Sequence, residues 1–150
     1  MRSPEQNLHM ISQVPKLMNL QVSIKKLSCG KFHCAILCDD GKIYTMGNNQ
    51  FGQLGIGREY KSTADDYAAS LNSSLHMSPD STFETHPKFV FGVSNISVDI
   101  SCGWYHTLAI AQDKSVYCWG RGDSGQLGIG RIKRAQVLPT KLDYFADKNN

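Results

Sequence analysis

The chain has 150 residues, of which 41% are hydrophobic and 19% are charged, and its formal net charge at pH 7 is +3. This length suits one ordinary domain, and the apolar fraction excludes a fully disordered chain. No apolar run reaches the roughly 18 residues of a membrane-spanning helix, and the N-terminus lacks a secretory signal pattern. We therefore expect an intracellular protein of the cytoplasm or nucleus, with no membrane association. The mild charge does not by itself indicate nucleic acid, and we expect no base-specific contact with it.

An internal repeat is the main feature of the sequence. Ser28-Cys29-Gly30 and His33 return 73 positions later as Ser101-Cys102-Gly103 and His106. The run from Gly52 to Arg58 also returns unchanged at that offset. Over 35 aligned positions, 14 residues are identical without a gap. A repeat of this kind decides the fold class before any single element does.

An insertion lengthens the first unit of the repeat. Pro139 follows Arg131 by 8 residues, whereas Pro87 follows Arg58 by 29, so the difference of 21 leaves an underlying period of 52. The segment is rich in Ser, Thr, Asp and Ala and has little periodicity, which favours a flexible loop. We divide the chain into a lead-in (1–14), a first repeat (15–58), an inserted loop (59–86), a second repeat (87–131), and a linker with the start of a truncated third repeat (132–150).

Each unit has the pattern of short β-strands. Alternating apolar and polar residues at 98–102 predict a half-buried strand, and Asp39-Asp40-Gly41 predicts a hairpin turn. The expected strands are 16–18, 25–29, 34–38 and 43–46 in the first unit, and 88–90, 98–102, 106–111 and 116–119 in the second. Four short antiparallel strands per 52 residues are typical of a propeller blade, so we predict an all-β protein.

The repeated pattern Cys-Gly-x-x-His, then a strand, then Gly-Gln-Leu-Gly-x-Gly resembles the repeat of the regulator of chromosome condensation family. It is carried here by 29–57 and by 102–130. The resemblance implies a seven-bladed propeller, of which this chain holds about two blades. The family includes exchange factors for the Ran GTPase that dock on chromatin, arms of ubiquitin ligases, a plant ultraviolet photoreceptor and scaffold proteins.

The shared residues are interpreted as structural rather than catalytic. A phosphate-binding glycine loop needs a following helix and a Lys-Ser/Thr pair, which are missing here, and no metal-ligand or cofactor pattern is present. An active site would seldom recur once per unit, so the two histidines are expected to bond to neighbouring backbone, and the five cysteines to be free thiols. The structural set is Cys29, Gly30, His33, Gly47, Gly52, Gln53, Leu54, Gly55 and Gly57, then Cys102, Gly103, His106, Gly120, Gly125, Gln126, Leu127, Gly128 and Gly130.

Two groups of residues are candidates for contact with a partner. Lys31, Phe32, Trp104 and Tyr105 fill the variable positions between the shared glycine and histidine, and aromatic and basic residues dominate binding hot spots. The alternative is that Trp104 only covers the neighbouring blade. A photoreceptor would need more clustered tryptophans than this chain has. The second group is Arg131, Lys133 and Arg134, which would contact phosphate or an acidic protein, or would simply be solvated.

The sequence thus predicts a non-enzymatic platform that binds a protein partner through loops on one propeller face, without a cofactor. The alternatives are nucleotide exchange on a Ran-type GTPase with chromatin docking, and a substrate-binding arm of a ubiquitin ligase. Two blades leave open edges, so we expect a fragment, a truncated gene model or an obligate assembler that needs further repeats or self-association.

Overall fold

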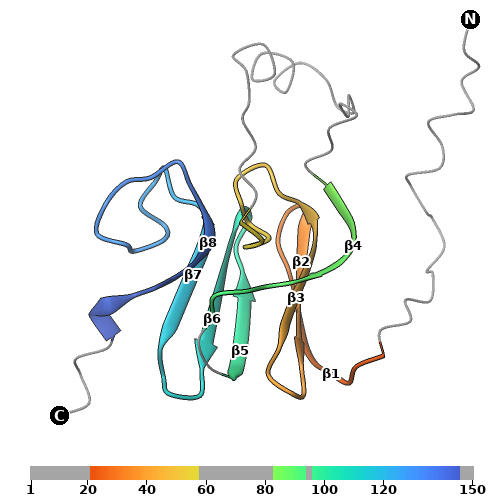
Figure 1. Cartoon of the computed structure of the whole chain (residues 1–150). Helices are drawn as coiled ribbons and strands as arrows, with labels where there is room; N and C mark the ends of the chain where they lie inside the picture. Colours follow the sequence, from red (N-terminus) through yellow and green to blue (C-terminus); the bar gives the residue numbers. More distant parts are fainter. Residues whose placement is uncertain (1–20, 58–82, 94–95, 146–150) are drawn as a thin grey trace, which may run out of the picture.

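The computed structural model describes residues 21–57, 83–93 and 96–145, which form two four-stranded antiparallel sheets side by side (Figure 1). The first sheet has the order β1 (Ile24–Cys29), β2 (His33–Cys38), β3 (Ile43–Asn48) and β4 (Phe83–Phe89). The second has β5 (Ser97–Cys102), β6 (His106–Ala111), β7 (Val116–Arg121) and β8 (Ala135–Lys141), and a short 3-10 helix, η2 (Asp143–Phe145), follows it. The predicted all-β fold of two blade-like sheets is confirmed.

The strands of the two sheets pair in the same register, so that residues shared by the two repeats occupy equivalent positions in the two sheets. His33 pairs with Gly47 in the first sheet, as His106 pairs with Gly120 in the second. Both glycines have positive φ angles, 105° and 104°. A Cβ atom on Gly47 would lie 2.5 Å from the carbonyl oxygen of Phe32. The repeat therefore keeps glycine where a strand bends close against the neighbouring hairpin turn.

The strand that contains Pro87 belongs to the first sheet. In β4, Phe89 pairs with Tyr44 and Lys88 with Thr45. The assignment of 88–90 to the strands of the second unit is therefore wrong, because this segment closes the sheet of the unit before it. Residues 83–86, expected in the flexible insertion, are part of β4, while 59–82 and the expected strand 16–18 lie outside the described residues. The boundaries of the sequence repeat are thus offset by one strand from the boundaries of the sheets.

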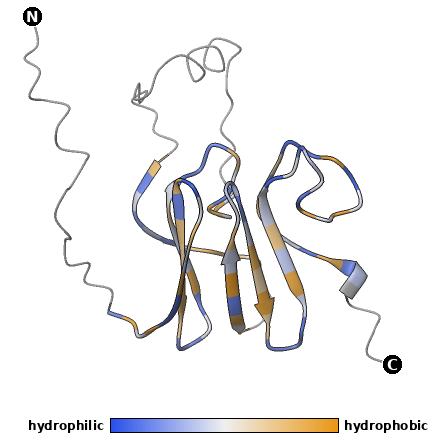
Figure 2. Ribbon diagram, turned by 180° about the vertical axis from the view of Figure 1, so that it is seen from behind, coloured by the Kyte–Doolittle hydropathy of each residue, from blue (hydrophilic) through white to orange (hydrophobic). Residues whose placement is uncertain are grey.

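The main core lies between the two sheets. Alternate residues of β2 and β3 point toward the second sheet, and alternate residues of β5, β6 and β7 point back. Figure 2 places most hydrophobic residues on the strands and most hydrophilic ones at the turns. The buried members of this core are Ala35, Leu37, Ile43, Val90, Ile100, Ala109, Ala111, Tyr117 and Trp119. A smaller cluster of Cys118, Leu127 and Leu142 lies on the other face of the second sheet.

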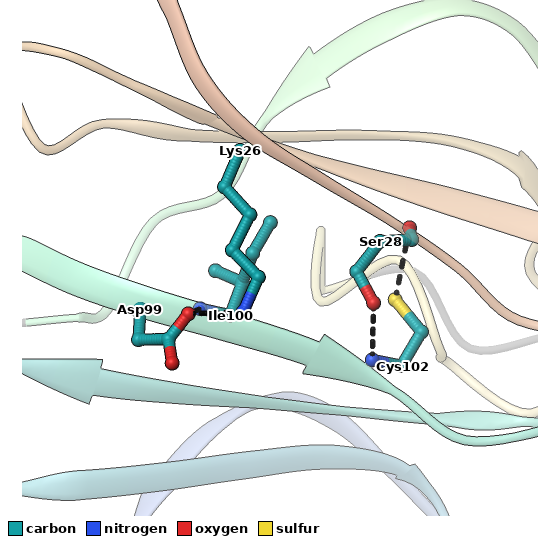
Figure 3. Close-up of polar contacts among 5 residues, drawn as sticks. All are labelled: Lys26, Ser28, Asp99, Ile100 and Cys102. Atoms are coloured by element: carbon teal, nitrogen blue, oxygen red, sulfur yellow. Dashed lines mark hydrogen bonds and ion pairs between the residues drawn. The ribbon is translucent and has the colours of Figure 1, made fainter.

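The first strands of the two sheets, β1 and β5, are joined directly (Figure 3). The backbone N–H of Cys102 donates to Oγ of Ser28 at 2.8 Å, and the Cys102 thiol donates to the Ser28 carbonyl oxygen at 3.4 Å. Nearby, Lys26 Nζ and Asp99 Oδ1 form an ion pair at 2.5 Å, with both side chains about half exposed. Side chain and backbone of β1 thus fix the position of β5.

A buried hydrogen-bond junction at Gln53 completes the contact between the sheets. Thr107 Oγ1 and Trp119 Nε1, both on the second sheet, donate to the Gln53 carbonyl oxygen at 3.0 and 2.9 Å. Thr107 Oγ1 also lies 2.9 Å from His33 Nε2. Since the threonine hydroxyl has one proton and donates it to Gln53, His33 must donate through Nε2. Its partner is therefore a hydroxyl on the next sheet, rather than the strand backbone expected from the sequence.

Candidate protein-contact surface

The four turn residues singled out in the sequence lie together at one end of the sheets. Lys31 and Phe32 form the turn between β1 and β2, and Trp104 and Tyr105 form the turn between β5 and β6. The backbone N–H of Lys31 donates to the Trp104 carbonyl oxygen at 3.0 Å, which joins the two turns. Equivalent positions in two repeats thus become neighbours in space.

Each turn is tight enough to direct its two side chains away from the sheet. Gly30 N–H donates to the His33 carbonyl oxygen at 2.8 Å, which closes a two-residue loop. The Trp104 side chain is 72% exposed and Phe32 is 52% exposed. Most of the Trp104 side chain therefore lies open to solvent.

Lys31 places its charge among three aromatic rings. Its Nζ lies 5.2 Å from the centre of the Phe32 ring, 5.3 Å from Trp104 and 5.7 Å from Tyr105. These separations lie within the range of cation–π attraction. Within the part of the chain that the structure describes, Lys31 forms no ion pair, so its ammonium group remains available to a carboxylate from outside.

Two further residues extend this surface, and the sequence analysis missed both. Phe51, in the loop after β3, lies 5.3 Å from Tyr105 between ring centres. Arg121, at the end of β7, places Cζ 5.0 Å from the Phe51 ring and 5.6 Å from the Tyr105 ring. We call the whole set the aromatic–basic patch, and its members are Lys31, Phe32, Phe51, Trp104, Tyr105 and Arg121.

The signal that could have revealed these two residues is divergence between the copies. At the offset of 73, Phe51 corresponds to Ser124, and Arg121 corresponds to Asn48. Both positions are adjacent to shared glycines, so the fold keeps the backbone and lets the side chain vary. Their proximity to the turns depends on how the two sheets pack, which a repeat pattern does not specify.

Arg121 is held in place by a carboxylate. Its Nη2 lies 2.8 Å from Asp123 Oδ2, and its Nε donates to both carboxylate oxygens at 2.8 and 2.9 Å. The hydrogen bond from Arg121 keeps the pKa of Asp123 below its ordinary value. The guanidinium is thereby presented as a planar group over the rings, with its orientation fixed.

The second predicted group lies on the segment that joins β7 to β8. Arg131, Lys133 and Arg134 are all exposed there, and Lys133 Nζ donates to Gln136 Oε1 at 3.0 Å. None of the ring and cation contacts that define the aromatic–basic patch involves these three residues. The backbone nevertheless brings the two groups near each other, since Gly122 N–H, next to Arg121, donates to the Arg134 carbonyl oxygen at 3.1 Å.

A cavity of about 240 Å³ lies at the opposite end, beside the turn between β2 and β3. Its charged lining residues Asp40 and Lys42 pair with each other at 2.7 Å, and Phe89, Val93 and Ile96 complete an apolar wall. Within the described ranges, no three His, Cys, Asp or Glu side chains come together to hold a metal ion. No helix among the described residues has the length and apolarity to cross a membrane.

Comparison with known proteins identifies the same repeats that form the two sheets. Two family models, both described as the regulator of chromosome condensation (RCC1) repeat, match the chain, one at 24–53 and 98–126 and the other at 40–110 and 113–149. A probable E3 ubiquitin-protein ligase of Homo sapiens, HERC6, is 32% identical over 77% of this chain and 9% of its own length. The ultraviolet-B receptor UVR8 of Arabidopsis thaliana is 37% identical over 71% of this chain and 20% of its own.

A solved structure has the same arrangement of strands. Prp20p of Saccharomyces cerevisiae, described with binding properties to Gsp1p and histones, superposes with a TM-score of 0.66 at 22% identity. The match covers 87% of this chain and 28% of Prp20p. The chain thus spans less than a third of each of these proteins, and the matches lie over the repeats. Its two sheets are blades of this propeller type, and the chain belongs to the family built from regulator of chromosome condensation repeats.

Proposed function

We propose that the chain is a non-enzymatic interaction platform that binds a protein partner through the aromatic–basic patch. The observation that carries this proposal is the clustering of four aromatic rings and two cations at one end of the two sheets, with Trp104 and Phe32 more than half exposed. Exposed aromatic and arginine side chains supply most of the energy at protein interfaces. The pairing of rings with cations favours a partner surface that combines carboxylates with apolar side chains.

The rigidity of the patch supports the same role. Its turns are two-residue loops closed by backbone bonds, and the Lys31–Trp104 backbone bond links them. A turn backbone held in this way loses little conformational entropy when a partner binds. By contrast, the cavity at the other end contains a mutually satisfied ion pair, and its ring Phe89 packs against Tyr44 and Phe91.

The experiment compares variants at the two ends of the molecule. Proximity labelling in cells identifies proteins near the chain, and each one is then purified and its affinity measured for Trp104→Ala, Lys31→Ala and Phe91→Ala. Phe91 is 68% exposed and lies outside the patch, so it is the matched control. We expect a partner whose Kd rises at least about tenfold with the two patch variants and stays unchanged with Phe91→Ala. If every identified partner binds all three variants equally, the patch is not the contact surface.

Nucleotide exchange on a Ran-type GTPase is the first alternative function. The fold of Prp20p favours testing it, since that protein is described with binding to Gsp1p. Release of labelled GDP from Ran, with and without the chain, distinguishes the two functions. Accelerated release would establish exchange, and unchanged release would leave the binding platform.

A substrate-binding arm of a ubiquitin ligase is the second alternative. It rests on the 32% identity to HERC6 over the repeats. In this case the partner that depends on Trp104 would itself be ubiquitylated in cells that contain the longer protein. Loss of that ubiquitylation with Trp104→Ala, but not with Phe91→Ala, would identify the arm.

We also propose that another repeat covers the outer face of the second sheet. A Cβ on Gly52 would meet Val137 of the second sheet at 2.7 Å, whereas the equivalent Gly125 has nothing within 4 Å. A second copy of this chain would be a poor cover. It would present Met46 and Cys34 at the places of Trp119 and Thr107, and so would lack the strong donors that the glycine loop receives in the first interface.

A further inference from the structure

Two cysteines face each other across the first hairpin. Cys29 on β1 and Cys34 on β2 are register partners. Gly30 and His33 form a hydrogen-bonded pair, because the Gly30 N–H donates to the His33 carbonyl oxygen. Hydrogen-bonded and non-hydrogen-bonded pairs alternate along an antiparallel ladder, so the next pair, Cys29 and Cys34, is non-hydrogen-bonded. Cα atoms of such pairs lie about 4.5 Å apart, and disulfides form at Cα separations of about 4.4–6.8 Å. The backbone therefore already has the spacing of a disulfide.

The second hairpin offers the matching geometry without the second thiol. Cys102 and Thr107 occupy the same two places, and Gly103 N–H donates to the His106 carbonyl oxygen. Cys102 Sγ lies 4.0 Å from Thr107 Oγ1. Side-chain atoms at this pair of positions thus approach each other closely, and only the first hairpin has sulfur on both sides.

The pair lies on the face of the first sheet that the second sheet does not cover. Ala35 points into the core, so by strand alternation Cys34 and its partner point the other way. Cys29 is exposed and Cys34 is half-buried. Burial, and next the proximity of Cys29, raise the pKa of the Cys34 thiol to about 12. An oxidant in solution therefore reaches the Cys29 thiol first. The Cys34 thiol lies next to it and is the group that can react with the oxidised Cys29.

We propose that Cys29 and Cys34 form a modification site, a dithiol that a hydroperoxide such as H₂O₂ oxidises to a cross-strand disulfide. In the first step the Cys29 sulfur takes one oxygen from the peroxide to give a sulfenic acid, and water leaves. In the second step the Cys34 sulfur attacks the Cys29 sulfur, and the sulfenic oxygen leaves as a second water with the Cys34 proton. Two thiols are oxidised by two electrons, and one peroxide is reduced to two waters.

The disulfide would close the hairpin that presents the Lys31 and Phe32 part of the aromatic–basic patch. Cys29 precedes Lys31 by two residues, and Cys34 follows Phe32 by two. The site itself does not depend on partner binding, because it is defined by thiol chemistry alone. A failure of either proposal is therefore visible independently of the other.

The test uses the full, folded chain. It is treated with H₂O₂, its remaining thiols are blocked with N-ethylmaleimide, and it is digested with trypsin, which cuts after Lys26, Lys31 and Lys42. The two cysteines then lie on separate peptides, 27–31 and 32–42, and fragment spectra separate Cys34 from Cys38. We expect the disulfide-linked pair of peptides to increase at least tenfold over the untreated chain and to disappear after reduction.

Three variants identify the sulfurs involved. Cys34→Ser should abolish the linked peptides and leave Cys29 as a sulfenic acid or a higher oxide. Cys29→Ser should leave Cys34 largely unmodified, and Cys102→Ala should still form the link. The proposal is overturned if the folded wild-type chain gives no linked peptides. It is equally overturned if Cys29 links mainly to Cys102, or if the chain in urea forms the 29–34 link as selectively as the folded chain.

Discussion

The protonation of His33 affects the stability of the protein, because this side chain is part of the buried hydrogen-bond junction between the sheets. Its pKa is lowered to about 4, mainly by burial and next by the nearby His106. In the unfolded chain the imidazole has an ordinary pKa of about 6.5, so below that pH the unfolded state binds the extra proton. The contribution of neutral His33 to the free energy of unfolding is thus fully present above about pH 6.5, and it is lost as the pH falls toward about 4. We expect a loss of about 2 kcal/mol between about pH 7 and about pH 5, measured by urea unfolding.

The replacement His33→Gln tests whether His33 causes this pH dependence of stability. Its amide donates to Thr107 Oγ1 as Nε2–H does, but it has no proton to gain in this pH range. The variant should lose most of the pH dependence. The matched variant His106→Gln should lose less, since burial lowers the pKa of His106 as well but no second histidine charge adds to the effect. A wild-type slope that persists in His33→Gln would assign the effect to another group.

The glycine loops allow a comparison between identical residues in different surroundings. Gly55 and Gly128 have nearly equal positive φ angles, 68° and 64°. A Cβ on Gly55 would lie 2.7 Å from Trp119 Nε1, whereas Gly128 has open space. Alanine at either position costs about 1–2 kcal/mol for the left-handed backbone, and overpacking against the buried indole adds about 1–3 kcal/mol at Gly55 alone. Thermal or urea unfolding of the two variants measures the difference, and equal losses would contradict the packing seen at Trp119.

At the scale of the strands, the β1–β5 contact depends more on its partly buried hydrogen bond than on its exposed ion pair. Ser28→Ala removes the acceptor of the Cys102 N–H and should cost about 1–2 kcal/mol. Lys26→Ala removes an exposed ion pair and should cost less than about 1 kcal/mol. Ser101 is the equivalent serine of the second sheet and is exposed, so Ser101→Ala should have almost no effect. Urea unfolding that ranks Lys26→Ala above Ser28→Ala would reverse this order.

The internal repeat made the strands and turns predictable, because the alternation at 98–102 and the turn at Asp39-Asp40-Gly41 are local signals. The place of the 83–89 strand was not predictable in this way. Its pairing with β3 bridges a long insertion, and period arithmetic on Pro87 assigned it to the following unit. Phe51 and Arg121 were missed for a related reason, since they join the patch only through the packing of one sheet on the next.

At the scale of the molecule, the two faces of the second sheet differ in what covers them. One face packs on the first sheet, while the other has Ile110 at 40% exposure beside the half-buried Leu108 and Val116. An apolar surface of this kind favours association in water. We expect the purified chain to associate reversibly and weakly, because a second copy brings Met46 and Cys34 where the first interface has Trp119 and Thr107.

Sedimentation equilibrium over a range of concentrations measures this association. Ile110→Lys places a charge on the outer face of β6 and should return the mean mass toward that of the monomer. Ile132→Lys adds the same charge at a position that is 77% exposed, in the segment between β7 and β8, and should leave the association unchanged. A strictly monomeric, cooperatively folding wild-type chain would mean that the outer face needs no cover. Equal effects of the two lysines would mean that net charge, rather than this face, controls the association.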